Sequence, residues 1–158
     1  MAFRLQDDWV WDSWFADDGH EFHLFYLHAP RSLQDQVLRH LNATVGHAVS
    51  TDLREWRVLP NALGPGPAGA WDDLATWTGS TIRHADIWYT LYTGVSKAER
   101  GLIQRLGLAT STDLSTWTKH PVSYTHLTLP TKVLVWRGGG GRGMERRGGG
   151  GGGGGGGG

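Results

Sequence analysis

Apolar and aromatic residues among the first 121 positions gather in short runs, and polar, turn-forming residues separate these runs. The runs 22–27 and 88–93 are rich in aromatic and branched residues, a composition that favours β-strands. One stretch, 31–41, could form a helix, and it lies inside a long loop. The pattern predicts an all-β protein.

The run of strands occurs twice. Residues 9–26 align without gaps with residues 75–92, 66 positions further along the chain. The residues matched in this way include the pairs Trp11 and Trp77, Asp12 and Thr78, and Tyr26 and Tyr92.

The second half of the repeat carries a turn. Residues 46–53 align with 107–114, and each segment holds a Ser-Thr-Asp-Leu turn whose polar side chains can bond backbone amides. A tryptophan follows each turn, Trp56 in the first copy and Trp117 in the second. Each copy therefore predicts four strands: one at the first tryptophans, one at 22–27 or 88–93, one before the turn and one after it.

Four strands per repeat are typical of a propeller blade. Two unrelated hairpin pairs or half of a β-sandwich are the alternatives, and the matched tryptophans and turns favour the propeller. Because a propeller needs about four blades or more to close its ring, we expect residues 1–121 to be two four-stranded blades of an incomplete five-bladed β-propeller, and the chain to be a fragment.

Composition separates residues 1–121 from 122–158. The first segment holds eight of the nine tryptophans and nine of the 25 glycines, with ten Lys and Arg against 14 Asp and Glu. No basic patch suggests a nucleic-acid partner, and no cysteine is present for disulfides or Cys-based metal sites. Without a membrane-length apolar run or a signal sequence, we expect no membrane partner and a cytoplasmic location, with secretion as the alternative if the start codon is misassigned. We also expect no cofactor.

The last 37 residues look foreign to the fold. Residues 122–131 match one reading frame of a transposon-end adapter used in sequencing libraries, and glycine runs follow at 138–141 and 148–158. A Gly-rich linker is the alternative, but a ten-residue adapter match followed by glycine has no physical rationale. We expect the native sequence to end at about Pro121, and 122–158 to be a non-native, disordered tail.

Asp12 is the leading candidate for chemistry, since it lies between Trp11 and Trp14 at the head of a predicted strand. Indole rings suit the C–H faces of sugars, and a carboxylate can act at an anomeric carbon. This arrangement indicates a sugar-processing site, whereas a turn-capping acid is the plain alternative. We expect packing roles for four other tryptophans, while Trp71 stays open; the four are Trp14, Trp56, Trp88 and Trp117.

Three histidines cluster near the second strand without a ligand geometry, so we expect no metal site. They are His20, His23 and His28.

Together these motifs resemble the five-bladed β-propeller glycoside hydrolases, the clan of families 32 and 68 that contains invertases, levanases and levansucrases. The run 10–14 resembles the nucleophile motif of the levansucrase branch, and 77–80 resembles the Trp-Ser-Gly-Ser strand of the second blade, with threonine at the serine position. Family 43 shares this fold and the blade turn. The resemblance covers nearly all of residues 1–121.

The resemblance implies a retaining glycosidase that acts on sucrose-like or other oligosaccharides. Asp12 would be the nucleophile, Thr78 would orient its carboxylate, and Trp11 and Trp77 would form walls of the sugar subsite. Such an enzyme needs a second carboxylate as proton donor, which the family takes from a later blade, together with an Arg-Asp-Pro motif. Residues 1–121 have no such motif, and their glutamates lie in polar loops or turns: Glu21, Glu55 and Glu99. We therefore expect the chain alone to be inactive; the alternative is a non-catalytic carbohydrate-binding or interaction propeller.

Overall fold

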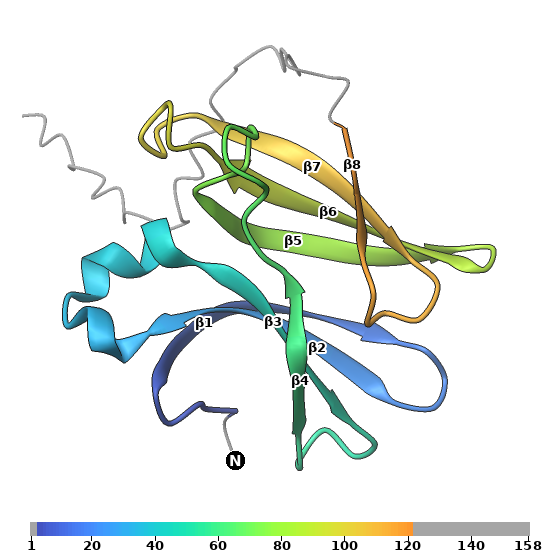
Figure 1. Ribbon diagram of the computed structural model, residues 1–158. Coiled ribbons are helices and arrows are strands. Elements are labelled where there is room, and N and C mark those ends of the chain that lie inside the picture. Colours follow the sequence, from blue (N-terminus) through green and yellow to red (C-terminus); the bar gives the residue numbers. More distant parts are fainter. Residues whose placement is uncertain (1–2, 122–158) are drawn as a thin grey trace, which may run out of the picture. The chain divides into compact units, whose positions relative to one another are not determined.

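The computed structural model describes residues 3–121, which form two four-stranded antiparallel sheets (Figure 1). The predicted tail at 122–158 lies outside the described residues. The first sheet holds β1 (Asp8–Asp17), β2 (Phe22–Pro30), β3 (Thr44–Ser50) and β4 (Arg57–Leu63). The second sheet holds β5 (Ala75–His84), β6 (Ile87–Val95), β7 (Gln104–Ser111) and β8 (Thr118–His120).

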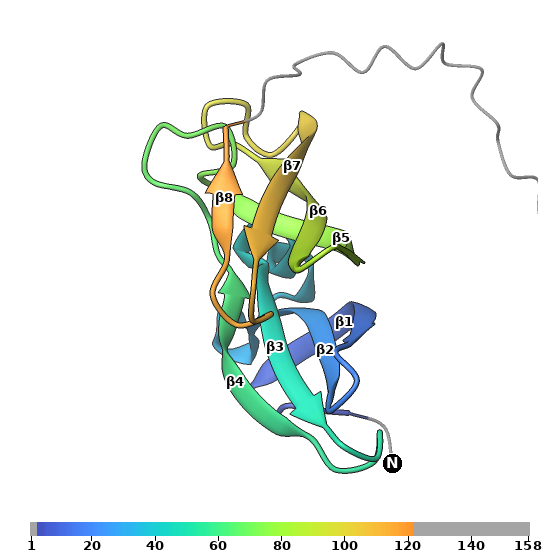
Figure 2. The same ribbon diagram turned by 90° about the vertical axis from the view of Figure 1, so that its right-hand side faces the viewer.

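Each sheet is a simple up-and-down meander in chain order, β1-β2-β3-β4 and β5-β6-β7-β8. Figure 2 shows the two sheets as successive twisted units joined by the β4–β5 connection. The predicted fold class, two four-stranded blades of an all-β propeller, is confirmed.

The long loop after β2 is partly helical. It contains two 3-10 segments, η1 (Arg31–Leu33) and η2 (Gln36–Asn42). The carboxylate of Asp35 caps η2 by accepting a 2.9 Å hydrogen bond from the backbone N–H of Val37. The stretch that suggested a helix therefore forms short helical turns rather than one α-helix.

The Ser-Thr-Asp-Leu turns form as predicted. Ser50 Oγ accepts from the N–H of Leu53, and Asp52 Oδ1 accepts from the amides of Arg54 and Glu55. These bonds hold Leu53 at φ 61°, in the left-handed region. In the second copy the aspartate accepts the same two amide hydrogen bonds, the serine accepts from the N–H of that aspartate, and the leucine has φ 60°.

A tyrosine lying over a glycine recurs in both sheets. Tyr26 pairs with Gly46 across β2 and β3, and Tyr92 pairs with Gly107 across β6 and β7. A Cβ on Gly46 would lie 2.4 Å from the ring of Tyr26, and one on Gly107 would lie 2.5 Å from the ring of Tyr92. The repeat thus preserves a packing unit in which only glycine leaves room for the ring.

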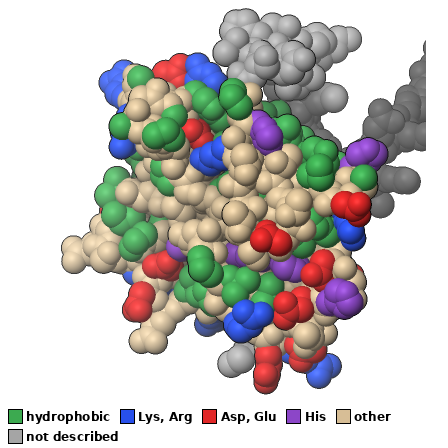
Figure 3. Space-filling view, turned by 45° about the vertical axis from the view of Figure 1, so that its right-hand side comes forward, with side chains coloured by type: hydrophobic (Ala, Val, Ile, Leu, Met, Phe, Trp, Pro, Cys, Tyr) green, Lys and Arg blue, Asp and Glu red, His purple; other side chains and the backbone are tan. Residues whose placement is uncertain are grey.

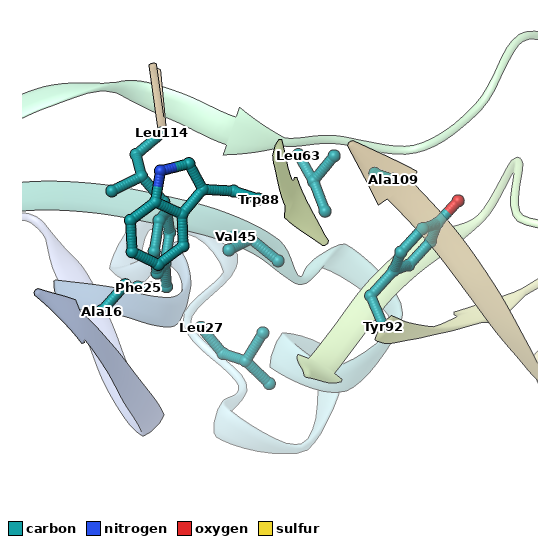
Figure 4. Packing of buried hydrophobic residues seen from close by; sticks show 9 residues of the cluster. All are labelled: Ala16, Phe25, Leu27, Val45, Leu63, Trp88, Tyr92, Ala109 and Leu114. Atoms are coloured by element: carbon teal, nitrogen blue, oxygen red, sulfur yellow. The ribbon is translucent and has the colours of Figure 1, made fainter. Parts of the chain in front are cut away.

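Buried side chains from both sheets form one core cluster between them (Figure 4). Trp88 belongs to this cluster, while Trp14 and Trp117 pack against it. Trp14 also donates from Nε1 to Thr81 Oγ1 of the second sheet at 3.0 Å. The members of the cluster are Ala16, Phe25, Leu27, Val45, Leu63, Trp88, Tyr92, Ala109 and Leu114.

The packing roles predicted for Trp14, Trp88 and Trp117 are confirmed. Trp56 packs elsewhere, against a separate cluster of Leu24, Tyr26 and Ala48 within the first sheet.

Candidate functional site

Asp12 and Thr78 meet where the first strands of the two sheets touch. The β1–β2 register shifts between Val10 and Ser13, and the β5–β6 register shifts between Trp77 and Gly79, so both residues lie in strand irregularities. Bulges of this kind re-aim a side chain away from the regular alternation. Thr78 Oγ1 donates a 2.6 Å hydrogen bond to Asp12 Oδ2.

This geometry leaves the Asp12 carboxylate exposed, with a single neutral partner among the described residues. Its side chain is exposed, and the only hydrogen bond to it within residues 3–121 comes from Thr78. One carboxylate oxygen is therefore held by a neutral donor, and the other accepts no hydrogen bond within residues 3–121. A carboxylate fixed in this way can act as a nucleophile or stabilise a developing positive charge.

Trp11 and Trp77 flank the Asp12–Thr78 pair and pack against the same buried residues. Both half-buried rings pack against a small cluster of Ala43, Ala75 and Val95. The structure thus brings the four predicted site residues into one region, since Trp11 precedes Asp12 and Trp77 precedes Thr78.

The loop segment η2 lies against both indoles. Trp77 Nε1 donates a 2.6 Å hydrogen bond to the backbone carbonyl of His40, and the His40 ring lies edge-on to Trp11 with 5.8 Å between ring centres. The guanidinium of Arg39 lies over the Trp11 ring, 5.1 Å from its centre. One face of Trp11 is therefore covered by Arg39. Neither residue belongs to the repeat, so the sequence pattern did not predict a role for Arg39 or His40.

Two of the three glutamates within residues 3–121 form ion pairs with other residues. Glu21 pairs with Arg57 at 3.5 Å, and Glu99 forms a two-pronged ion pair with Arg105. The Arg105 guanidinium holds the pKa of Glu99 below its usual range, so this carboxyl stays ionised near neutral pH and is poorly suited to donate a proton. None of the hydrogen bonds within residues 3–121 joins a glutamate to Asp12.

Two histidines form a buried stacked pair. His23 Nδ1 and His47 Nε2 lie 2.9 Å apart, and His23 Nε2 lies 3.3 Å from Asp18 Oδ2. Burial, helped by the nearby His23, lowers the pKa of His47 to about 4. Hydrogen bonds from backbone amides, first that of Glu21, lower the pKa of Asp18 to about 2.

His28, the other histidine of β2, forms its own contacts. Its Nδ1 lies 2.5 Å from Asp8 Oδ2, and its Nε2 lies 2.9 Å from Thr44 Oγ1. Within the described part of the chain, no group of three or more His, Cys, Asp or Glu residues is arranged to hold a metal ion.

Charges of both signs are interspersed on the surface. On the face shown in Figure 3, Lys and Arg side chains are scattered among acidic, histidine and hydrophobic ones. A separate hollow of about 450 Å³, mostly apolar, borders Trp11, Trp56 and Phe3, and Asp12 is not part of its lining.

Solved structures define the class of this fold. The chain is similar to a GH32 beta-fructofuranosidase of Bombyx mori, with 28% identity, a TM-score of 0.54, and coverage of 74% of this chain and 22% of that one. It also resembles a family 117 glycoside hydrolase of Zobellia galactanivorans, with a TM-score of 0.63 and 10% identity over 77% of this chain and 41% of that one, which shows the fold alone. The two sheets are blades of the β-propeller found in glycoside hydrolases.

Sequence relatives narrow this class to one family. Residues 14–134 match the glycosyl hydrolases family 32 N-terminal domain, and the chain belongs to this family. The matched range begins just after Trp11 and Asp12, and it continues past Pro121, so it does not mark the boundary expected there.

Curated relatives agree with this family. One is a bifunctional 6(G)-fructosyltransferase/2,1-fructan:2,1-fructan 1-fructosyltransferase of Allium cepa, 38% identical over 60% of this chain and 14% of its own length. Another is an acid beta-fructofuranosidase of Capsicum annuum, 44% identical over 46% of this chain and 10% of its own. The chain spans less than a fifth of the length of these relatives. None of the helices among residues 3–121 is long and apolar enough to cross a membrane.

Proposed function

We propose that Asp12 is the nucleophile of a retaining enzyme that cleaves or transfers a fructosyl unit of sucrose or a fructan. The observation that carries this proposal is the 2.6 Å hydrogen bond from Thr78 to an exposed Asp12 at the contact of the two first strands. Trp11 and Trp77 flank this pair and would border the sugar. The fructosyl substrate is supported by the relatives named as fructosyltransferase and beta-fructofuranosidase.

In this mechanism the Asp12 carboxylate attacks the anomeric carbon while a second carboxyl group protonates the leaving oxygen. A covalent glycosyl-enzyme forms, and water or another sugar then releases it. The two carboxyl groups of a retaining pair lie about 5–5.5 Å apart. We propose that the partner of Asp12 comes from a further blade of a longer protein, because no glutamate within residues 3–121 is hydrogen-bonded to Asp12. The 158-residue chain alone would then be inactive.

Replacing Asp12 in the full-length enzyme tests this proposal. Asp12→Asn keeps the shape and an acceptor for Thr78 but cannot attack carbon, so kcat on sucrose should fall by several orders of magnitude, roughly 5 kcal/mol or more of transition-state stabilisation. Asp86→Asn is the matched control, since the Asp86 side chain is fully exposed in another turn. If Asp12→Asn kept a tenth of the wild-type kcat, the nucleophile assignment would be wrong.

A binding propeller without catalysis is the second candidate, favoured by the lack of a carboxylate paired with Asp12 within residues 3–121. The same Asp12→Asn variant separates the two functions. A binding module would show no turnover in the wild type and would keep its sugar affinity in the variant.

A further inference from the structure

The loop after β2 places two basic side chains beside the tryptophans that flank Asp12. The Arg39 guanidinium lies 5.1 Å from the centre of the Trp11 ring. The His40 imidazole lies edge-on to both indoles, with ring centres 5.8 Å from Trp11 and 6.4 Å from Trp77. His40 therefore lies next to both aromatic walls of the proposed sugar site.

Backbone contacts fix the position of this loop on the second sheet. The carbonyl of His40 accepts from Trp77 Nε1 at 2.6 Å, and the carbonyl of Ala43 accepts from the backbone N–H of Thr76 at 3.2 Å. On the side of the loop these bonds use main-chain carbonyls only. They set η2 against β5 and leave the side chains of Arg39 and His40 available for a ligand.

Both side chains have unused hydrogen-bonding capacity. Nε of Arg39 is buried and has no hydrogen-bond partner within the described residues. A buried donor without an acceptor costs free energy, which a ligand oxygen would recover. The His40 side chain is exposed, and its ring nitrogens take part in none of the hydrogen bonds found within residues 3–121. Guanidinium and imidazole N–H groups are good donors to sugar hydroxyl oxygens.

We propose that Arg39 and His40 are specificity-determining residues that hydrogen-bond the hydroxyls of the sugar held between Trp11 and Trp77, beside Asp12. This inference rests on the function proposed for Asp12. The ligand is a neutral oligosaccharide unit with adjacent hydroxyl groups. Arg39 would act while stacked on Trp11, which holds its planar fork of donors in place.

Steady-state kinetics of the full-length enzyme on sucrose, with D-fructose as a competitive inhibitor, test this role. Arg39→Ala and His40→Ala should each raise KM and the inhibition constant of fructose about tenfold, the effect of losing one ligand hydrogen bond, and change kcat less than about threefold. His40→Ala keeps the backbone carbonyl that holds Trp77. Arg39→Lys should recover only part of the affinity, since lysine lacks the planar fork.

Matched controls come from exposed residues of the same types. Arg54→Ala, in the turn after β3, and His84→Ala, at the end of β5, should leave KM and the fructose inhibition constant unchanged. A merely structural role for η2 would instead lower kcat and the thermal midpoint together.

The outcomes separate this inference from the proposed function. Unchanged KM and fructose inhibition in both alanine variants would overturn it, even with Asp12→Asn inactive. If Asp12→Asn stayed active, the nucleophile assignment would fail, while the fructose inhibition constant would still decide whether Arg39 and His40 bind sugar.

Discussion

Thr78 and Asp12 occupy equivalent positions of the two repeats, and their side chains meet in a 2.6 Å hydrogen bond although 66 residues separate them. The first blade supplies the charged group and the second supplies the donor that holds it. The contact between two neighbouring blades therefore assembles the pair. Neither sheet alone would contain it.

Removing the Thr78 hydroxyl should lower turnover without unfolding the protein. Thr78→Val keeps the shape but loses the donor to Asp12, so we expect kcat of the full-length enzyme to fall about 10- to 100-fold, in line with about 1–3 kcal/mol for a hydrogen bond to a charged group. Thr78→Ser keeps the hydroxyl and should stay within about threefold of wild type. Because Thr78 is exposed, the thermal midpoint should not move. A Val variant as active as the Ser variant would show that the bond has no catalytic role.

Filling the space over Gly46 should destabilise the first sheet. In Gly46→Ala the new methyl group would lie within 3 Å of the Tyr26 ring, which must shift, at a cost of about 1–3 kcal/mol. Urea denaturation measures this change. Gly64→Ala is the control, since nothing lies within 4 Å of a Cβ there. Equal stability of the two variants would mean that the ring moves aside freely.

Acid should destabilise the fold through His47. Its pKa is about 4 in the folded state against 6.5 for the free side chain. Between these two pH values, His47 therefore binds a proton in the unfolded chain but not in the folded chain. The stability that depends on neutral His47 is complete above pH 6.5 and is lost as pH falls toward 4, by up to about 3 kcal/mol.

The thermal midpoint measured from pH 8 to pH 4 checks this slope. His47→Gln should flatten the profile in that window, whereas His84→Gln, at an exposed position, should leave it as in wild type. A profile that is equally steep in His47→Gln would assign the acid sensitivity to other groups. Of these, Asp18, with its pKa near 2, would act only below about pH 4.

The stability of the fold should depend on the ion pair between the buried Asp72 and Lys119. Lys119 Nζ lies 2.5 Å from Asp72 Oδ2, which also accepts a 2.9 Å hydrogen bond from the Tyr92 hydroxyl. Lys119→Met leaves a carboxylate almost fully buried without its counter-charge and should cost about 3 kcal/mol. Asp72→Asn should cost less, because the Lys119 side chain is 25% exposed and reaches water.

Urea denaturation compares these variants, with the exposed Lys97→Met as control. Should Lys119→Met prove no worse than Lys97→Met, the ion pair would contribute nothing to stability.

The sequence alone determined the features that depend on short range and on repetition. Strand composition and the doubled pattern predicted two four-stranded units, and the Ser-Thr-Asp-Leu turns followed from hydrogen bonds that span two or three residues. The place of Asp12 between two tryptophans pointed to it as the reactive group, and the resemblance to a known family added Thr78 as the residue that orients its carboxylate. Such signals are visible because periodicity and turn chemistry are encoded by neighbouring residues.

Which distant side chains meet depends on the packing of the folded chain. Arg39 and His40 lie on an irregular loop whose side-chain directions follow no period, so their approach to Trp11 and Trp77 could not be predicted. The same holds for His23 with His47, 24 residues apart, and for Asp72 with Lys119, 47 residues apart. These contacts depend on how sheets and loops pack in three dimensions, and no local pattern of residues specifies that packing.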